Sequence, residues 1–163
     1  ALQHHALIVL GPYMPARQRR KLIKKGKKID RVSIIEFDNR MEDLISAAKA
    51  VVTMGGYNTF CEILSFDKPA LIVPRILPRE EQLIRTRRAE DLGLVEMLLP
   101  SEATDAARMA AALRSLPNRR RPSQKSPGLR LDGMTNISLK IGRWLEREPH
   151  QQLGLVDRTS FNP

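Results

Sequence analysis

A short polar segment after an apolar strand has the residue types needed to bind a phosphate group. The segment Gly55-Gly56-Tyr57-Asn58-Thr59 directly follows the apolar run 51–54. A helix that begins here leaves its first backbone N–H groups without intrahelical partners, and the helix dipole adds positive charge at the same end. Such helix starts bind anions, phosphates above all. The pattern therefore predicts a phosphate site at this turn.

Acidic and amide side chains follow the turn at two places. Glu62 lies about one helical turn further on, and Glu81 and Gln82 come after the next apolar strand. An ionised carboxylate accepts hydrogen bonds without donating any, which suits a sugar diol, whereas an amide both donates and accepts. A phosphate cradle combined with these groups indicates a nucleotide-sugar site.

A purely structural interpretation of the same residues stays open. Glycine pairs after strands often form plain turns, because glycine tolerates positive φ at little cost. Thr59 and Glu62 have the spacing of a capping box, in which each side chain satisfies a free backbone N–H at a helix start. The capping box and a ligand role are compatible, since a carboxylate can be released when a ligand arrives.

The composition is that of one soluble globular domain. The chain has 163 residues, of which 42% are hydrophobic and 28% charged, and this length can bury a core. No apolar run approaches the roughly 20 residues that a membrane-spanning helix needs. The start has no basic region ahead of an apolar core, so it does not have the features of a signal peptide. It also lacks an initiator Met, which indicates a fragment of a longer protein. A single cysteine fits a reducing compartment, so we expect a cytoplasmic location.

The formal net charge of +10 is concentrated in the stretch 17–31 and in the cluster 119–121. This balance favours anionic partners, and contact with an anionic membrane surface is one expectation for the stretch 17–31. A solvated helix face is the alternative. Aromatic residues make up only 4% of the chain, so no stacking platform for bases is visible and nucleic acid is not an expected partner.

Apolar strands alternate with helices along most of the chain. We expect strands at 6–10, 32–37, 49–54, 69–73 and 94–98, and helices at 15–25, 40–48, 57–66, 79–92 and 102–116. Strands that are apolar throughout belong in a parallel sheet covered on both faces, so the fold class is a doubly wound, Rossmann-like α/β domain. Ligands of such sheets bind outside the carboxyl ends of the strands, where the Gly55-Gly56 turn lies.

The pattern divides the chain into four parts. Residues 1–116 form the Rossmann-like nucleotide-sugar-binding domain, and residues 117–134 a basic, Pro- and Ser-rich mobile loop. Residues 135–148 are an amphipathic helix that we expect to pack on the domain. Residues 149–163 are expected to be a flexible tail.

The ordered motifs resemble the donor-binding signature of GT-B glycosyltransferases, most closely the C-terminal domain of family 28. The residues that carry the resemblance are Met54-Gly55-Gly56-Tyr57-Asn58-Thr59, Glu62, Pro69, Pro74 and Glu81-Gln82. It extends from about residue 6 to residue 116, and more weakly through the helix around Trp144. Two positions differ from related patterns: Met54 replaces the histidine of plant-type members, and Glu81 replaces the glutamine of the peptidoglycan N-acetylglucosaminyltransferase.

The resemblance implies a role for each site residue. The backbone at Gly55, Gly56 and Asn58, with the Thr59 hydroxyl, would hold the diphosphate of a UDP-sugar. Glu62 would bind the ribose hydroxyls, and Glu81 and Gln82 the hydroxyls of the transferred sugar. Phe37 would flank the base and Met41 would close that pocket, although Phe37 fits equally well as a core aromatic at a strand end.

The resemblance also implies what lies outside the chain. GT-B enzymes have a second, N-terminal lobe that supplies the acceptor site and the catalytic base, and even the first strand, turn and helix of the C-terminal lobe are missing here. We expect the donor-binding lobe of an enzyme that transfers a sugar, with N-acetylglucosamine as a candidate, and that is incomplete alone. No metal or cofactor is implied. The alternatives are a non-catalytic nucleotide-sugar-binding module that needs a partner chain, and a sugar epimerase of the same architecture.

Overall fold

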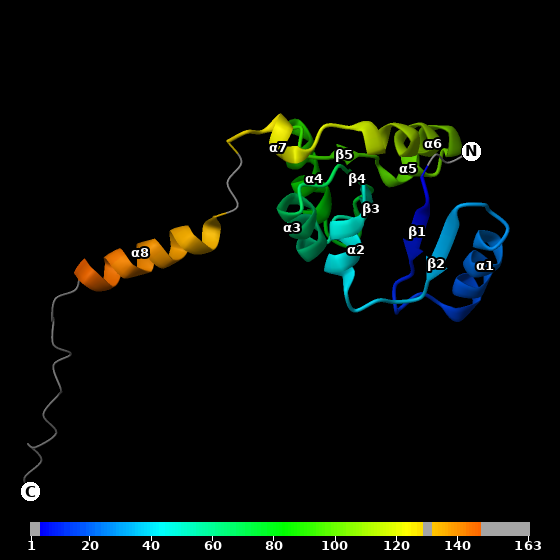
Figure 1. Ribbon diagram of the computed structural model, residues 1–163, viewed down its shortest axis with the longest axis horizontal. Coiled ribbons are helices and arrows are strands. Elements are labelled where there is room, and N and C mark those ends of the chain that lie inside the picture. The colour runs from blue at the N-terminus through cyan, green and yellow to red at the C-terminus, as the bar shows by residue number, and fades with distance from the viewer. Residues whose placement is uncertain (1–3, 129–131, 148–163) are drawn as a thin grey trace, which may run out of the picture. The chain divides into compact units, whose positions relative to one another are not determined.

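A computed structural model of the chain describes residues 4–128 and 132–147. It separates into two compact units, residues 1–129 and residues 130–163, which are described here one at a time. Figure 1 shows the strands of the first unit with helices around them. No helix among the described residues is both long enough and apolar enough to cross a membrane.

The first strand pair joins β1 (Ala6–Val9) and β2 (Val32–Ile35), which run parallel. Their connection contains α1 (Ala16–Gly26), which packs against β2. A Cβ added at Gly26 would lie 2.3 Å from Cδ1 of Ile34, so the missing side chain allows α1 to approach the strand closely.

The second sheet carries the predicted site. Its strands are β3 (Val51–Thr53), β4 (Ala70–Ile72) and β5 (Glu96–Met97), in the order β3-β4-β5 and all parallel. The helix α3 (Tyr57–Ser65) connects β3 to β4, and α4 (Glu81–Asp91) connects β4 to β5. A shorter helix, α2 (Met41–Ala47), precedes β3 and contacts α3.

A single apolar cluster holds these elements together. All three residues of β4 are buried, which the unbroken apolar run in the sequence predicts for a central parallel strand. Fully burying one Val, Leu or Ile side chain contributes roughly 1.5–3 kcal/mol to stability. The buried members of the cluster are Ile63, Ala70, Ile72, Ala89, Leu94 and Val95.

The parallel α/β architecture is confirmed, but the strands form two ladders where one sheet was expected. Among the described residues, β1 and β2 form one ladder and β3 to β5 the other. The strands are two to four residues long, and the connection with α2 separates β2 from β3. No ladder hydrogen bonds join the two sets of strands in the described chain.

Two segments differ from the predicted elements. The helix expected at 102–116 is two helices, α5 (Pro100–Ala103) and α6 (Ala106–Ser115), followed by the short 3-10 helix η1 (Leu116–Asn118). The break arises because the side chain of Asp105 accepts hydrogen bonds from the N–H groups of residues 107 and 108 and so begins a new helix.

The segment expected to be a mobile loop contains a further helix, α7 (Pro122–Lys125). Its start is fixed in two ways, because Pro122 is buried and the Gln124 side chain accepts a hydrogen bond from the N–H of Arg121. Ser123 then binds Asp67 through both its backbone N–H, at 2.8 Å, and its hydroxyl, at 2.7 Å.

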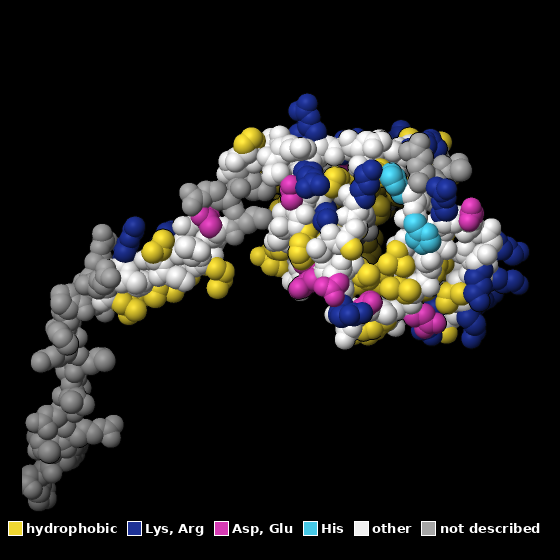
Figure 2. All heavy atoms as spheres, viewed as in Figure 1, with side chains coloured by type: hydrophobic (Ala, Val, Ile, Leu, Met, Phe, Trp, Pro, Cys, Tyr) yellow, Lys and Arg dark blue, Asp and Glu magenta, His cyan; other side chains and the backbone are white. Residues whose placement is uncertain are grey.

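The described part of the second unit is one helix, α8 (Gly133–Arg147), which confirms the predicted helix. Figure 2 shows hydrophobic side chains gathered along one side of it. Ile137, Ile141, Trp144 and Leu145 have the matching spacing. Packing of this helix on the domain stays a prediction, and the tail expected at 149–163 lies outside the described residues.

Candidate functional site

The turn after β3 requires glycine at its first position. Gly55 is buried and has φ of +74°. A Cβ at this position would lie 2.8 Å from Cγ2 of Ile72 and 3.3 Å from Oγ1 of Thr86. The backbone of the turn is therefore pressed against both β4 and α4, and only glycine fits there.

The second glycine is placed differently. Gly56 is the N-cap residue of α3, and a Cβ added to it would meet nothing within 4 Å. The first intrahelical hydrogen bond runs from the N–H of Phe60 to the carbonyl of Gly56, at 2.9 Å. No side chain in the described part of the chain caps the start of α3, so the first N–H groups of the helix have no side-chain partner.

The capping-box interpretation of Thr59 and Glu62 is wrong. The helix begins at Tyr57, three residues earlier than that interpretation requires, and Gly56 takes the N-cap position. Thr59 is consequently the third residue of the helix. Asn58 and Glu62 are four residues apart within α3, which places them on the same face, with Glu62 one turn away from the helix start.

The acid–amide pair lies at the start of the next helix. Glu81 and Gln82 are the first two residues of α4, which begins two residues later than the helix predicted at 79–92. The Oε1 atom of Gln82 accepts a hydrogen bond of 3.1 Å from the N–H of Arg75, which leaves its NH₂ group to donate. The fully buried Thr86 donates to the Gln82 carbonyl at 2.7 Å. These bonds fix the first turn of α4.

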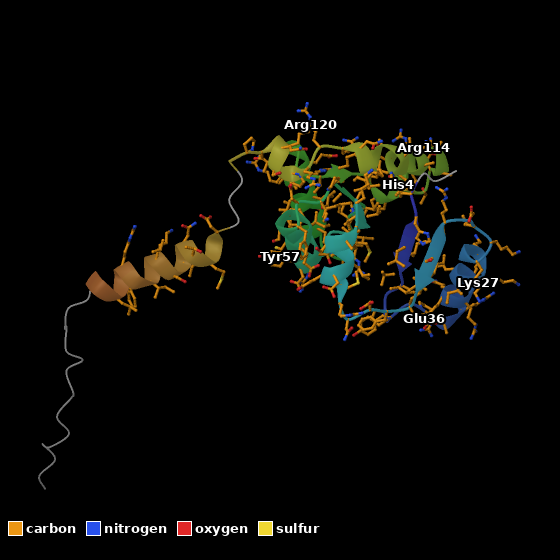
Figure 3. All side chains as sticks on the ribbon, viewed as in Figure 1. His4, Lys27, Glu36, Tyr57, Arg114 and Arg120 are labelled. Atoms are coloured by element: carbon orange, nitrogen blue, oxygen red, sulfur yellow. The ribbon has the colours of Figure 1, made fainter. Side chains whose placement is uncertain are left out.

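Arg85 links the two halves of the predicted site. Its Nη2 donates to the carbonyl oxygen of Gly55 at 3.0 Å, and its Nη1 pairs with Oε1 of Glu81 at 2.7 Å. The guanidinium carbon lies 5.5 Å from the centre of the Tyr57 ring, and Figure 3 labels Tyr57 at the start of α3. The sequence did not single out Arg85, because its contact with Gly55 spans 30 residues and depends on the fold.

A shallow pocket opens at the carboxyl ends of β3 and β4, which is the edge where ligands of parallel sheets bind. Its volume is about 370 Å³, and most of its lining side chains are apolar. The lining residues are Met54, Val73, Pro74, Arg75, Ile76, Leu77 and Pro100.

The two residues expected to hold the base lie close together in sequence, Phe37 in the connection between β2 and α2 and Met41 at the start of α2. Phe37 is 62% exposed, so its interpretation as a core aromatic is wrong. Asp38 accepts a hydrogen bond of 2.7 Å from the N–H of Arg40, which shapes the turn before α2. Met41 is half-buried as the first residue of α2. Among the described contacts, none joins Phe37 or Met41 to the glycine turn.

Positive charge gathers over one part of the first unit. In Figure 2 many dark blue side chains lie over α1.

No group of three or more His, Cys, Asp or Glu side chains within the described ranges is arranged to hold a metal ion.

The family model for the glycosyltransferase family 28 C-terminal domain matches residues 1–138. Two similar proteins are UDP-N-acetylglucosamine--N-acetylmuramyl-(pentapeptide) pyrophosphoryl-undecaprenol N-acetylglucosamine transferases. The protein from Thermosipho africanus is 30% identical over 122 residues, or 74% of this chain and 34% of that protein. The protein from Geobacillus thermodenitrificans is 30% identical over 86 residues, or 52% of this chain and 24% of that protein. The chain thus spans about a quarter to a third of the length of these relatives.

Two solved glycosyltransferase structures share the fold. The glycotransferase of kitacinnamycin superimposes with a TM-score of 0.57 at 15% identity, covering 88% of this chain and 43% of that one. The calicheamicin glycosyltransferase superimposes with a TM-score of 0.55 at 16% identity, covering 90% and 45%. These likenesses confirm the expected α/β fold. The match of the family model over residues 1–138 shows that the chain belongs to glycosyltransferase family 28 and carries its C-terminal domain.

Proposed function

We propose that this chain is the donor-binding lobe of a glycosyltransferase that uses a UDP-sugar. The observation that carries the proposal is the uncapped start of α3 behind a turn that only glycine can make. The diphosphate would lie against Gly56, Asn58 and Thr59, where backbone N–H groups and the helix dipole favour negative charge. Gly55 allows the backbone of the turn to pack closely against Ile72 and Thr86, on the side away from the diphosphate.

The other site residues then take positions along the donor. Glu62, one turn into α3, accepts hydrogen bonds from the ribose hydroxyls. Glu81 and the free NH₂ of Gln82 bind the hydroxyls of the transferred sugar. The apolar pocket beside Met54 and Leu77 suits the C–H face of a sugar ring. The base lies towards Phe37 and Met41.

The chemistry of this lobe is the stabilisation of the leaving group. When the bond between the sugar and the diphosphate breaks, negative charge grows on the departing UDP. Backbone N–H groups that already point at that charge stabilise the transition state without having to reorganise. A second lobe, on the same chain or on a partner chain, would hold the acceptor and supply the base. The names of the relatives support N-acetylglucosamine as the transferred sugar.

Replacing Glu62 tests this proposal. Loss of two charge-assisted hydrogen bonds to the ribose should weaken UDP binding by roughly 100-fold or more in Glu62→Ala, because each such bond contributes about 1.5–3 kcal/mol net of water. Calorimetric titration of the full chain with UDP and with UDP-N-acetylglucosamine measures the effect. Asp91→Ala, which removes an exposed carboxylate from the last residue of α4, is the matched control and should bind like the wild type.

Two results would contradict the proposal. One is unchanged affinity for UDP in Glu62→Ala. The other is equal affinity of the wild-type chain for ATP and UDP. Assays of sugar transfer by the chain alone and with candidate partner proteins then test the alternative of a binding module that needs a partner chain. Transfer by the chain alone would exclude that module, and transfer that appears only with a second protein would support it.

A further inference from the structure

Arg85 is a charged side chain held inside the fold beside the proposed donor site. Its side chain is only 17% exposed. Its two terminal nitrogens have separate partners, the Gly55 carbonyl and the Glu81 carboxylate, while its Nε is buried without a partner. The rings of Tyr57 and Phe60 lie 5.5 and 5.7 Å from the guanidinium carbon. Burying a cation is costly, so a position this restricted indicates a specific role.

The contact with Gly55 determines where the next N–H group points. A trans peptide unit is planar, and its C=O and N–H point in opposite directions. Because Arg85 draws the Gly55 carbonyl towards α4, the N–H of Gly56 in the same peptide unit points away from α4. The space on the outer side of Gly56 is open. Neither glycine has a side chain that could orient this peptide, so the Arg85 bond supplies a restraint that these two residues lack themselves.

The contact with Glu81 acts at the other end of the site. Pairing with Nη1 holds one carboxylate oxygen of Glu81, whose side chain remains 67% exposed. The second oxygen is left to accept hydrogen bonds from a ligand. One rigid guanidinium thereby sets the relative positions of the glycine turn and the first residue of α4, which a flexible ammonium group could not do with the same geometry.

We propose that Arg85 is a positioning residue of the donor site, which turns the Gly56 N–H towards the diphosphate and aligns Glu81 with the transferred sugar. The proposal rests on the function proposed above. It assigns to Arg85 an effect on the diphosphate and sugar of the donor and none on the nucleoside.

Comparing UDP with uridine separates this role from general support of the fold. In Arg85→Met, affinity for UDP should fall roughly 10- to 100-fold, as expected for misdirected hydrogen bonds to a charged group, while affinity for uridine stays within about twofold. Arg85→Lys keeps the charge but not the two-pronged geometry, and should remain at least about threefold weaker than the wild type for UDP. Arg87→Met, at an exposed position of the same helix, is the control and should bind both ligands normally.

A spectroscopic measurement on the unliganded full chain tests the positioning by itself. The backbone amide resonance of Gly56 should shift or broaden in Arg85→Met and Arg85→Lys and stay unchanged in Arg87→Met. An unchanged Gly56 resonance in Arg85→Met would overturn the inference, as would equal losses of UDP and uridine affinity or full UDP affinity in Arg85→Lys. A wild-type chain that binds UDP no better than uridine would instead overturn the proposed function, and the Gly56 resonance still decides the role of Arg85 in shaping the turn.

Discussion

Two neighbouring glycines at the start of α3 have different physical roles. Gly55 has a positive φ and no room for a side chain, because Ile72 and Thr86 lie where its Cβ would be. Gly56 has an ordinary negative φ of −53° and open space around it. The first position therefore maintains the fold, and the second leaves room for a ligand.

Substituting alanine at each glycine should separate stability from binding. Gly55→Ala should lower the free energy of unfolding by about 1–3 kcal/mol, through backbone strain and the close contact with Ile72. Gly56→Ala should lower it by at most about 1 kcal/mol, the cost of a poor N-cap residue. Gly56→Ala should nevertheless weaken UDP binding, because its methyl group occupies the space in front of the cradle. Urea unfolding and calorimetric titration measure the two effects.

Gly11→Ala provides the control for both substitutions, since a Cβ at Gly11 also meets nothing within 4 Å. It should change unfolding by less than about 0.5 kcal/mol and leave UDP binding intact. Equal losses of stability at Gly55 and Gly56 would contradict the assignment of separate roles.

At the scale of elements, the described segment after α6 is tied to the core. Ser123 in α7 binds both carboxylate oxygens of Asp67, in the turn between α3 and β4. Arg119, just before α7, pairs with Glu96 of β5. These contacts anchor to the sheet a segment whose composition alone indicates a mobile loop.

Removing the Ser123 hydroxyl should loosen that anchor. Ser123→Ala should cost about 0.5–1.5 kcal/mol of unfolding free energy, the net value of one hydrogen bond, and should speed amide hydrogen exchange within α7. Ser46→Ala, at an exposed position of α2, is the matched control and should leave both quantities unchanged. Protection of α7 at the wild-type level in Ser123→Ala would show that the anchor does not depend on this bond.

The parts of the fold that were predictable from the sequence have local signals. The strands β3 and β4 are apolar runs followed by glycine or proline, and α3 and α4 begin close to the expected residues. The glycine turn and the Glu81-Gln82 pair could be located for the same reason. The break before α6 was missed because its apolar spacing continues across Asp105, although Asp105 is a good N-cap residue. Pro122, at the first position of α7, was a similar signal.

The rest depends on contacts between distant residues. In the sequence, Arg85 is one of several arginines that are expected on the surface of a helix. Its low exposure follows only from the packing of α4 against the Gly55-Gly56 turn. The exposure of Phe37, two residues beyond β2, likewise depends on what covers that end of the strand. Local patterns could therefore identify the groups that would touch the donor but could not identify the group that orients them.

At the scale of the whole molecule, the net charge of +10 has an uneven distribution. The helix α1 contains no acidic residue, and its exposed basic residues include Arg20, Lys21, Lys24 and Lys25. Figure 2 shows the concentration of basic side chains over this helix. Charges that gather on one helix raise the local potential more than the same number spread over the surface. We propose that α1 is the surface through which the chain contacts anionic membranes.

Vesicle sedimentation tests this proposal. Replacing Arg20, Lys21, Lys24 and Lys25 together by alanine should reduce binding to phosphatidylserine-containing vesicles by roughly 100- to 1000-fold, since each basic residue near such a surface contributes about 1 kcal/mol. Replacing Arg87, Arg88, Arg114 and Arg120 removes the same charge from other elements and should have a much smaller effect. Raising the ionic strength from about 0.1 M to 1 M shortens the screening length from about 10 Å to 3 Å and should release the wild-type chain. Equal losses in the two variants would mean that net charge, and not α1, governs binding, because only a local surface distinguishes two sets of equal charge.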